Sequence, residues 1–327
     1  MKTIRWGIIG VGNVTEVKSG PAFRKAENSE LVAVMRRDSV KAEDYAKRHG
    51  VRKWYTDASK LVHDPDVDAV YIATPPHVHQ EYTLLAAAAC KPVYVEKPMG
   101  LNAAECEEMI LACRNAGVPL WVAHYRRKLA KFEALKALVQ SQAIGRIDSV
   151  LRECQMPLME TDPENLPWRV LPEIAGGGKF VDLGSHTFDL LDFLFGPIDE
   201  AHGSATNRGE AYPAEDNVVA QFRFKSGIIG CGSWCFTGSQ PIDRLVLSGS
   251  QGQIECSVFN DAPIRIRDAS GALTEQHHPF PEHVQQPMIQ SIVDELNSHG
   301  HCPSTGEDAA RTTRVMTSIL SSFYENM

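Results

Sequence analysis

The sequence lacks the long hydrophobic runs that a membrane-spanning protein needs. No apolar run approaches the roughly 18–20 residues of a transmembrane helix. The opening MKTIRWGIIG is a poor signal peptide, because its apolar stretch is short and contains glycine. We therefore expect a soluble, cytoplasmic protein that acts without a membrane.

An excess of basic charge is also missing. The chain has 33 basic and 41 acidic residues, for a net charge of −8, which argues against a nucleic-acid partner. Hydrophobic residues make up 43% of the chain and charged residues 23%, a balance typical of packed domains. At roughly 150 residues per domain, the 327 residues suggest two domains.

Motifs for disulfides and structural metals are absent. The eight cysteines form no C-x-x-C pair, and the twelve histidines show no zinc spacing. On one strand, Cys231 and Cys235 would lie about 13 Å apart, too far for a disulfide. We expect buried free thiols and no metal.

What the first 120 residues do contain is an alternation of short apolar runs with helical segments. Asp38 and Gly50 are suited to begin and end one helix, as are Asn102 and Gly117 for another. Apolar strands separated by helices predict a parallel sheet covered on both faces, as in a Rossmann dinucleotide-binding domain. The expected strands are 4–10, 31–35, 67–73, 92–96 and 119–123.

After about residue 145 the apolar residues alternate with a period of two. This pattern predicts a large, open, mainly antiparallel sheet with one covered face. The expected strands are 217–224, 228–236, 242–247, 253–259 and 263–267, followed by a helix at 307–324. The fold class is therefore α/β. We place a Rossmann domain at 1–123 and a substrate-binding and dimerisation domain at 124–327, whose last helix can pack back on the first domain.

A glycine-rich turn follows the first strand. Gly10 and Gly12 occupy the first two positions of G-x-G-x-x-G, and Thr15 occupies the third. The first glycine permits a tight turn and the second lets backbone approach a pyrophosphate, with Asn13 and Val14 opening the helix. Thr15 suggests looser packing between helix and strand. A purely structural turn is the alternative.

The second strand ends in two arginines where NAD-binding proteins usually have an acidic residue. Arg36 and Arg37 suit a 2′-phosphate through charge-assisted bonds, which favours NADP(H) over NAD(H). Asp38 is better suited to cap the next helix. The alternative is a pair of solvated arginines.

Two further segments lie at the predicted carboxyl ends of strands, where open α/β sheets bind ligands. Thr74, Pro75 and His79 belong to T-P-P-x-x-H, which follows the third strand. Glu96 and Lys97 belong to E-K-P, which follows the fourth. A lysine at this edge can hydrogen-bond a substrate hydroxyl and hold its developing alkoxide.

The strongest constellation is a glycine triplet, 176–178, followed by Asp182, His186 and Asp189. The spacing i, i+4, i+7 places the three side chains on one face of a helix. A histidine beside carboxylates can act as a general base whose tautomer its neighbours fix. The triplet lets backbone approach a cofactor or substrate. The alternative is a capped core helix, since apolar residues share the face of His186.

In order and spacing, these motifs together resemble the glucose–fructose oxidoreductase / inositol dehydrogenase / MocA (Gfo/Idh/MocA) family. The similarity covers nearly the whole chain, including the late segment 302–311. It implies that Lys97, Asp182 and His186 line the active site. Trp168 and Arg169 resemble a pair that touches the cofactor in the dimeric dihydrodiol dehydrogenase and glucose–fructose oxidoreductase branches. The ending of strand two at 37–38 also resembles those NADP-using branches, whereas Pro76 replaces a common asparagine.

The resemblance implies an NADP(H)-dependent oxidoreductase that acts on a hydroxyl or ketone of a sugar, cyclitol or diol. It also implies a homodimer, or a dimer of dimers, assembled through the open sheet. Two alternatives remain: a cofactor-bound regulatory protein without turnover, and a glycosidase or eliminase that uses NAD as a transient redox catalyst.

Overall fold

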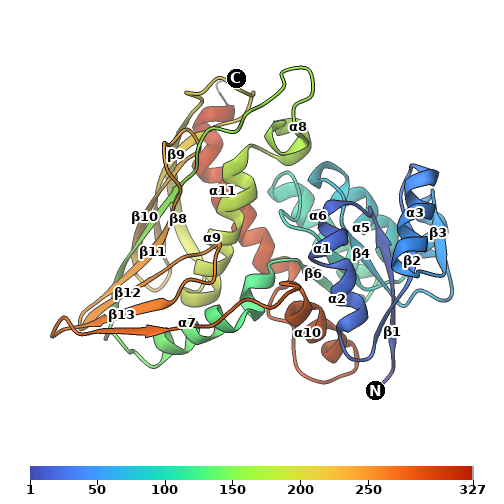
Figure 1. Cartoon of the computed structure of the whole chain (residues 1–327), viewed down its shortest axis with the longest axis horizontal. Coiled ribbons are helices and arrows are strands. Elements are labelled where there is room, and N and C mark those ends of the chain that lie inside the picture. The colour runs from blue at the N-terminus through green and yellow to red at the C-terminus, as the bar shows by residue number, and fades with distance from the viewer. Residues whose placement is uncertain (326–327) are drawn as a thin grey trace. The chain divides into compact units, whose positions relative to one another are not determined.

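The computed structural model describes residues 1–325, which fall into two compact units (Figure 1). Unit 1 contains Met1–Lys128 and Pro281–Ala310. Unit 2 contains Leu129–Phe280 and the chain from Arg311 onward. The long helix α11 (Gly306–Tyr324) begins in unit 1 and continues in unit 2.

Unit 1 is built on the predicted parallel sheet. Its six strands are all parallel to their neighbours, in the order β3-β2-β1-β4-β5-β6 of a Rossmann fold. The short β3, in which Trp54 is 39% exposed, carries too weak an apolar signal to be predicted. The strands are β1 (Ile4–Ile9), β2 (Ser29–Met35), β3 (Lys53–Tyr55), β4 (Ala69–Ile72), β5 (Val93–Val95) and β6 (Leu120–Val122).

The helices of unit 1 begin and end close to their predicted caps. Asp38 accepts a hydrogen bond from the Lys41 N–H, and Gly50 ends the same helix at φ +62°. Asn102 caps α6 by accepting from the Glu105 N–H, and the Glu105 carboxylate accepts from the Leu101 N–H. The helices are α1 (Asn13–Val17), α2 (Gly20–Lys25), α3 (Ser39–His49), α4 (Ala58–Val62), η1 (Pro76–Val78), α5 (His79–Ala88), α6 (Ala103–Asn115), η2 (Tyr125–Lys128) and α10 (Gln286–Leu296). Although far along the chain, α10 packs beside α2 (Figure 1).

Aromatic side chains fill part of the core of unit 1. Trp6, Phe23, Tyr71 and Tyr94 are fully buried and form a continuous series with ring centroids 4.9–5.1 Å apart. Removing a ring of this kind typically costs about 3–5 kcal/mol of stability, because the cavity does not close completely. The series therefore anchors β1, β4 and β5, whose carboxyl ends carry the predicted site.

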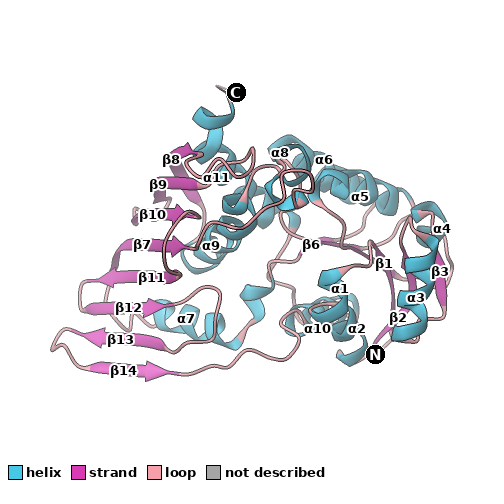
Figure 2. Cartoon of the chain, turned by 45° about the horizontal axis from the view of Figure 1, so that its top comes forward, coloured by secondary structure: helices cyan, strands magenta, loops and turns pink. Residues whose placement is uncertain are grey.

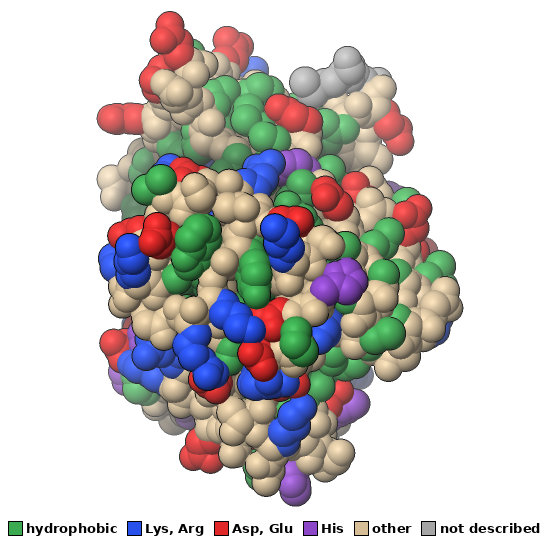
Figure 3. Space-filling view, turned by 90° about the vertical axis from the view of Figure 1, so that its right-hand side faces the viewer, with side chains coloured by type: hydrophobic (Ala, Val, Ile, Leu, Met, Phe, Trp, Pro, Cys, Tyr) green, Lys and Arg blue, Asp and Glu red, His purple; other side chains and the backbone are tan. Residues whose placement is uncertain are grey.

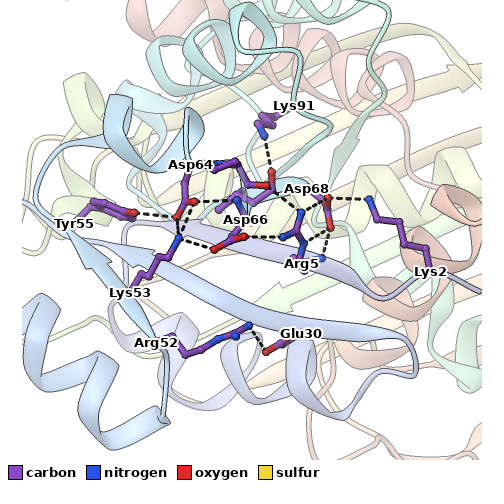
Figure 4. Close-up of polar contacts among 12 residues, drawn as sticks. Lys2, Arg5, Glu30, Arg52, Lys53, Tyr55, Asp64, Asp66, Asp68 and Lys91 are labelled. Atoms are coloured by element: carbon purple, nitrogen blue, oxygen red, sulfur yellow. Dashed lines mark hydrogen bonds and ion pairs between the residues drawn. The ribbon is translucent and has the colours of Figure 1, made fainter.

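At the opposite edge of the sheet, ion pairs join the loop before β4 to the amino-terminal ends of β1 and β3 (Figure 4). Lys53 Nζ lies 2.9 Å from Asp64 and 2.7 Å from Asp66. Asp68 contacts Arg5 Nε at 3.0 Å and Lys2 Nζ at 2.9 Å. The loop before β4 is thereby fastened to the starts of β1 and β3, away from the G-x-G turn.

Unit 2 contains one eight-stranded sheet in the order β14-β13-β12-β11-β7-β10-β9-β8 (Figure 2). Only β7 and β10 pair in parallel, so the prediction of a mainly antiparallel sheet is confirmed. The strands are β7 (Ile147–Gln155), β8 (Ile198–Thr206), β9 (Asn217–Phe224), β10 (Ile229–Cys235), β11 (Ile242–Gly249), β12 (Gly252–Cys256), β13 (Ile264–Asp268) and β14 (Leu273–Gln276). The other elements are α7 (Ala130–Gln140), η3 (Trp168–Val170), α8 (Pro172–Ala175) and α9 (Lys179–Phe195).

Helix α9 covers one face of this sheet. Along β9 the burial alternates, with Phe222 and Phe224 inside and Val219 outside. Phe188 of α9 packs edge-on against Phe222 at 5.5 Å and also contacts Trp234. The other face leaves several apolar side chains exposed, which are Leu151, Val219, Ile229 and Ile242.

The eight cysteines are free, but they are not all buried as we expected. Cys90 and Cys231 are exposed and Cys235 is partly exposed. Within residues 1–325, no helix is long and apolar enough to cross a membrane. On the outer side of α3 and β3, lysine and arginine side chains lie interspersed with acidic ones (Figure 3).

Candidate active site

The G-x-G turn touches the segment that follows β4. Gly10 has φ +95°, and a Cβ there would lie 2.6 Å from Cγ2 of Thr74, so glycine is required for both conformation and space. Gly12 is the N-cap of α1, and a Cβ added there meets no atom within 4 Å. The turn is therefore packed at its first glycine and open at its second.

Thr15 does not loosen the packing, contrary to our expectation. Its side chain is fully buried, and its hydroxyl accepts from Gly12 N–H at 2.9 Å and donates to the Gly12 carbonyl at 2.8 Å. The Thr15 carbonyl accepts from the Tyr45 hydroxyl at 2.9 Å. Gly20 allows this close approach, because a Cβ there would overlap the Thr15 carbonyl.

The two arginines after β2 have different surroundings. Arg36 Nη1 donates a 2.7 Å hydrogen bond to the carbonyl of Val11, inside the G-x-G turn. Arg37 is exposed. Asp38 caps α3, as predicted.

His79 connects the T-P-P and E-K-P segments. Its ring is buried, with Nδ1 3.0 Å from the Pro98 carbonyl and Nε2 2.8 Å from the Thr74 carbonyl. Burial lowers the pKa of His79, and a neutral imidazole carries one N–H, which donates to one of the two carbonyls at a time. Its contacts are thus with this chain's own backbone.

A buried polar network lies under Lys97. Glu96 Oε1 accepts from the Tyr71 hydroxyl at 2.5 Å and from Gln285 Nε2 at 2.7 Å, while its Oε2 lies 3.3 Å from the Lys97 backbone nitrogen. Gln285 in turn accepts from the Tyr94 hydroxyl at 3.1 Å. Burial raises the pKa of both tyrosines well above its usual range, so both are neutral donors. The network fixes the backbone from which Lys97 projects.

Further basic residues, His124, Arg126 and Arg127, follow β6. This strand lies next to β5, the strand that precedes Lys97. Burial lowers the pKa of His124 well below its usual range, and the positive charges of Arg127, Lys97 and Arg126 lower it further. Sequence reasoning missed Gln285 and the basic residues after β6. The basic residues had a detectable signal in the sequence, since they follow the end of β6 as Lys97 follows the end of β5.

In unit 2, α9 confirms the predicted helix. Asp182, His186 and Asp189 are four and three residues apart on it, which places them on one face. The Asp182 side chain is 29% exposed, whereas His186 and Asp189 are buried. The His186 ring packs edge-on against Phe259, with centroids 6.2 Å apart.

Arg169, of the predicted pair Trp168 and Arg169, contacts Asp182 in the first turn of α9. Arg169 Nε lies 3.7 Å from Asp182 Oδ2, and its guanidinium lies 4.3 Å from the centre of the Trp168 ring. Both residues belong to η3, which precedes the glycine triplet. Trp168, Arg169, Asp182 and His186 therefore all belong to unit 2.

At Gly178 the glycine triplet approaches this chain's own backbone, where we had expected a cofactor or substrate. A Cβ on Gly178 would lie 2.7 Å from the Glu215 carbonyl and 2.8 Å from the Ala214 Cβ. Glu215, which sequence reasoning missed, is fully buried, and burial raises its pKa to about 6.

Comparison with known proteins agrees with this architecture. Residues 4–124 match the model of the oxidoreductase family with an NAD-binding Rossmann fold, and residues 132–255 match the GFO/IDH/MocA C-terminal domain. The chain is 40% identical to oxidoreductase P35 of Formosa agariphila over 319 aligned residues. The alignment covers 96% of this chain and 97% of the relative. It is 30% identical to 1,5-anhydro-D-fructose reductase of Ensifer adhaerens, over 93% of this chain and 91% of the relative.

A solved structure extends the comparison to three dimensions. Aldose–aldose oxidoreductase from Caulobacter crescentus, complexed with glycerol, matches with a TM-score of 0.88 and 25% identity, over 100% of this chain and 99% of that one. The two sheets, the two matched family models and the relatives all indicate the same family. The chain belongs to the Gfo/Idh/MocA family of NAD-binding oxidoreductases.

Proposed function

We propose that the protein is an NADP(H)-dependent oxidoreductase acting on a hydroxyl or ketone of a sugar, cyclitol or related diol. The observation that carries this proposal is the pair of polar sites that the two units present. Lys97 stands at the carboxyl edge of a dinucleotide-binding sheet, and Asp182 and His186 share one face of α9.

The residues of unit 1 fit a nicotinamide dinucleotide. Gly12 leaves open space at the N-cap of α1, where backbone can approach a pyrophosphate with Asn13 and Val14. Arg37 is exposed and can bind a 2′-phosphate, which favours NADP(H). Thr74, Pro75 and Glu96 complete this edge, and we assign Trp168 and Arg169 of unit 2 to the same cofactor. His79 supports this cofactor-binding edge by joining the T-P-P and E-K-P segments.

The bound cofactor supplies hydride transfer, and the protein supplies position and charge. In oxidation, an imidazole nitrogen of His186 takes the proton of the substrate hydroxyl. The Lys97 ammonium donates a hydrogen bond to the same oxygen and steadies the alkoxide, while Asp182 orients His186 or binds a neighbouring hydroxyl. General acid–base help of this kind is typically worth about 10²–10⁴-fold.

A polyhydroxy substrate is supported by the relatives. One relative is named for 1,5-anhydro-D-fructose, and one related structure contains glycerol. We assign specificity to the segments 156–174 and 201–215, of which the structure places 168–170 in η3, 172–175 in α8 and 201–206 in β8. The two segments contact each other, since the Thr161 hydroxyl donates to the Ala211 carbonyl at 3.0 Å. They also share a small apolar cluster around Val170 and Tyr212.

We further propose a cytoplasmic homodimer, or a dimer of dimers, that uses neither nucleic acid nor membrane. The supporting observation is the outer face of the large sheet, with its exposed apolar side chains.

Absorbance of the reduced nicotinamide, followed against a panel of sugars, cyclitols and diols, tests the function. We expect net reduction of NADP⁺ in proportion to substrate oxidised. Substrate conversion without net change of the cofactor would instead indicate a transient redox catalyst. Cofactor binding without turnover on any panel member would indicate a regulatory protein.

A further inference from the structure

A buried carboxylate closes the N-terminus of α9. Glu215 is fully buried, and its Oε1 and Oε2 lie 2.8 Å and 3.0 Å from the backbone nitrogen of Gly178, whose N–H they accept. Oε2 also accepts from the hydroxyl of Tyr324, on α11, at 2.5 Å. Both oxygens of this carboxylate therefore have donors.

This contact binds the N–H of the N-cap residue itself, whereas an N-cap side chain would accept from the second or third residue of the helix. Gly178 is the N-cap residue of the 17-residue α9 and has no side chain with which to cap it. The carboxylate that accepts from the N-cap backbone comes from 37 residues later in the chain. A negative charge at this end of a helix is also favoured by the helix dipole.

The approach depends on glycine. Any side chain at Gly178 would collide with the Glu215 carbonyl at 2.7 Å, and Gly177 has φ +152°, which L residues rarely adopt. The triplet thus permits the segment at 214–215 to reach the start of α9.

The first turns of α9 carry the proposed chemistry. Asp182 lies in the first turn of α9 and His186 one turn further on. At the other end of the helix, Arg311 of α11 holds Asp192 through contacts of 2.9–3.2 Å. Helix α11 therefore holds α9 near both of its ends, through Arg311 directly and through Tyr324 by way of Glu215.

We propose that Glu215 is a positioning residue for the reaction, and that it sets the direction of the first turns of α9 through Gly178 and Tyr324. This inference rests on the proposed function, because it gives Asp182 and His186 their place in the site. A small displacement of a reacting group has a large effect on rate without a matching effect on cofactor binding.

The experiment compares Glu215→Ala and Glu215→Gln in the full-length protein. We expect Glu215→Ala to lower kcat about tenfold, with the Kd of NADP(H) within about twofold of the unmodified protein. Glu215→Gln keeps a carbonyl acceptor for Gly178 N–H, so its kcat should return to within about threefold. Phe224→Leu is the matched control, since its ring packs on Phe195 at the far end of α9. It should lower the Tm and leave kcat unchanged.

Where Glu215→Ala does not fold, Tyr324→Phe takes its place, because it removes one hydrogen bond and keeps the ring. A loss of kcat at unchanged Kd then supports the inference. A normal kcat in the folded Glu215 or Tyr324 variant, or a loss that simply follows the Tm as in Phe224→Leu, would overturn it.

His186→Ala is measured in parallel and separates the two proposals. If His186→Ala loses turnover while Glu215→Ala keeps it, the positioning role is wrong and the proposed function stands. If His186→Ala keeps normal turnover, the proton-transfer role of His186 is wrong, and the positioning role of Glu215 is wrong with it. The proposed function itself is overturned only if the unmodified protein shows no net turnover of the nicotinamide on the whole panel.

Discussion

Arg36 donates a 2.7 Å hydrogen bond to the carbonyl of Val11, so a side chain from the end of β2 supports the turn that follows β1. Its neighbour Arg37 is exposed. Two arginines that are adjacent in the sequence therefore have different surroundings. We propose that Arg36 supports the turn and that Arg37 binds the 2′-phosphate of the cofactor.

The first prediction concerns cofactor choice. Arg37→Ala should weaken NADP(H) binding about 10- to 100-fold and leave NAD(H) nearly unchanged, because a charge-assisted phosphate contact is worth about 1.5–3 kcal/mol. Arg36→Ala should weaken both cofactors, because it releases the turn. Fluorescence titration at low salt measures both affinities. Equal affinities of the unmodified protein for NADP(H) and NAD(H) would contradict the assignment.

The second prediction concerns proton transfer. Lys97→Met and His186→Ala should each lower turnover at least about 10²-fold while cofactor affinity stays within a few-fold. The double variant should be less impaired than the product of the two single effects, since both residues act on one proton transfer. Steady-state kinetics on the same substrate provides all four values. Near-normal turnover in His186→Ala would identify this histidine as a core residue and leave Lys97 as the leading proton carrier.

The third prediction concerns assembly. The outer face of the sheet exposes Leu151 and Val219, so we expect a dimer formed through it. The double variant Leu151→Arg/Val219→Arg should dissociate this dimer, because it places charge in an apolar interface. Val40→Arg, at an exposed position of α3, is the control. Light scattering that finds the unmodified protein monomeric at every concentration would refute the prediction.

The fourth prediction concerns acid stability. Partial burial opposes ionisation of Asp68, but hydrogen bonds from Arg5 and Lys2 outweigh it and lower its pKa to about 2. Because the folded pKa lies below the unfolded value of about 3.9, the stabilisation is complete above that value and lost as pH falls toward 2. It amounts to at most about 2.6 kcal/mol, and to less where solvent screens the exposed Lys2.

Urea unfolding at a series of pH values measures this contribution. Asp68→Asn should lower the free energy of unfolding at neutral pH and flatten its fall between about pH 4 and 2. Asp44→Asn, which removes an exposed pair with Arg48, should change it little. Parallel curves for Asp68→Asn and the unmodified protein would show that the ion pairs of Asp68 contribute nothing.

Much of the fold was predictable because its signals are local. Apolar runs, the caps at Asp38 and Asn102, and the period-two pattern of β9 each depend on residues close in the chain. The G-x-G turn and the spacing of Asp182 and His186 are local in the same sense. Short, half-exposed β3 was missed because three residues carry too little pattern.

The contacts that hold the candidate site were decided only by the tertiary structure. Gln285 reaches Glu96 across 189 residues of sequence, and Glu215 reaches Gly178 across 37. The sequence alone determined which residue types stand at the ends of strands and on one face of a helix, since backbone periodicity sets those positions. Which of them share hydrogen bonds follows from packing, because a buried polar group takes the partner that the fold brings to it, wherever that partner lies in the chain.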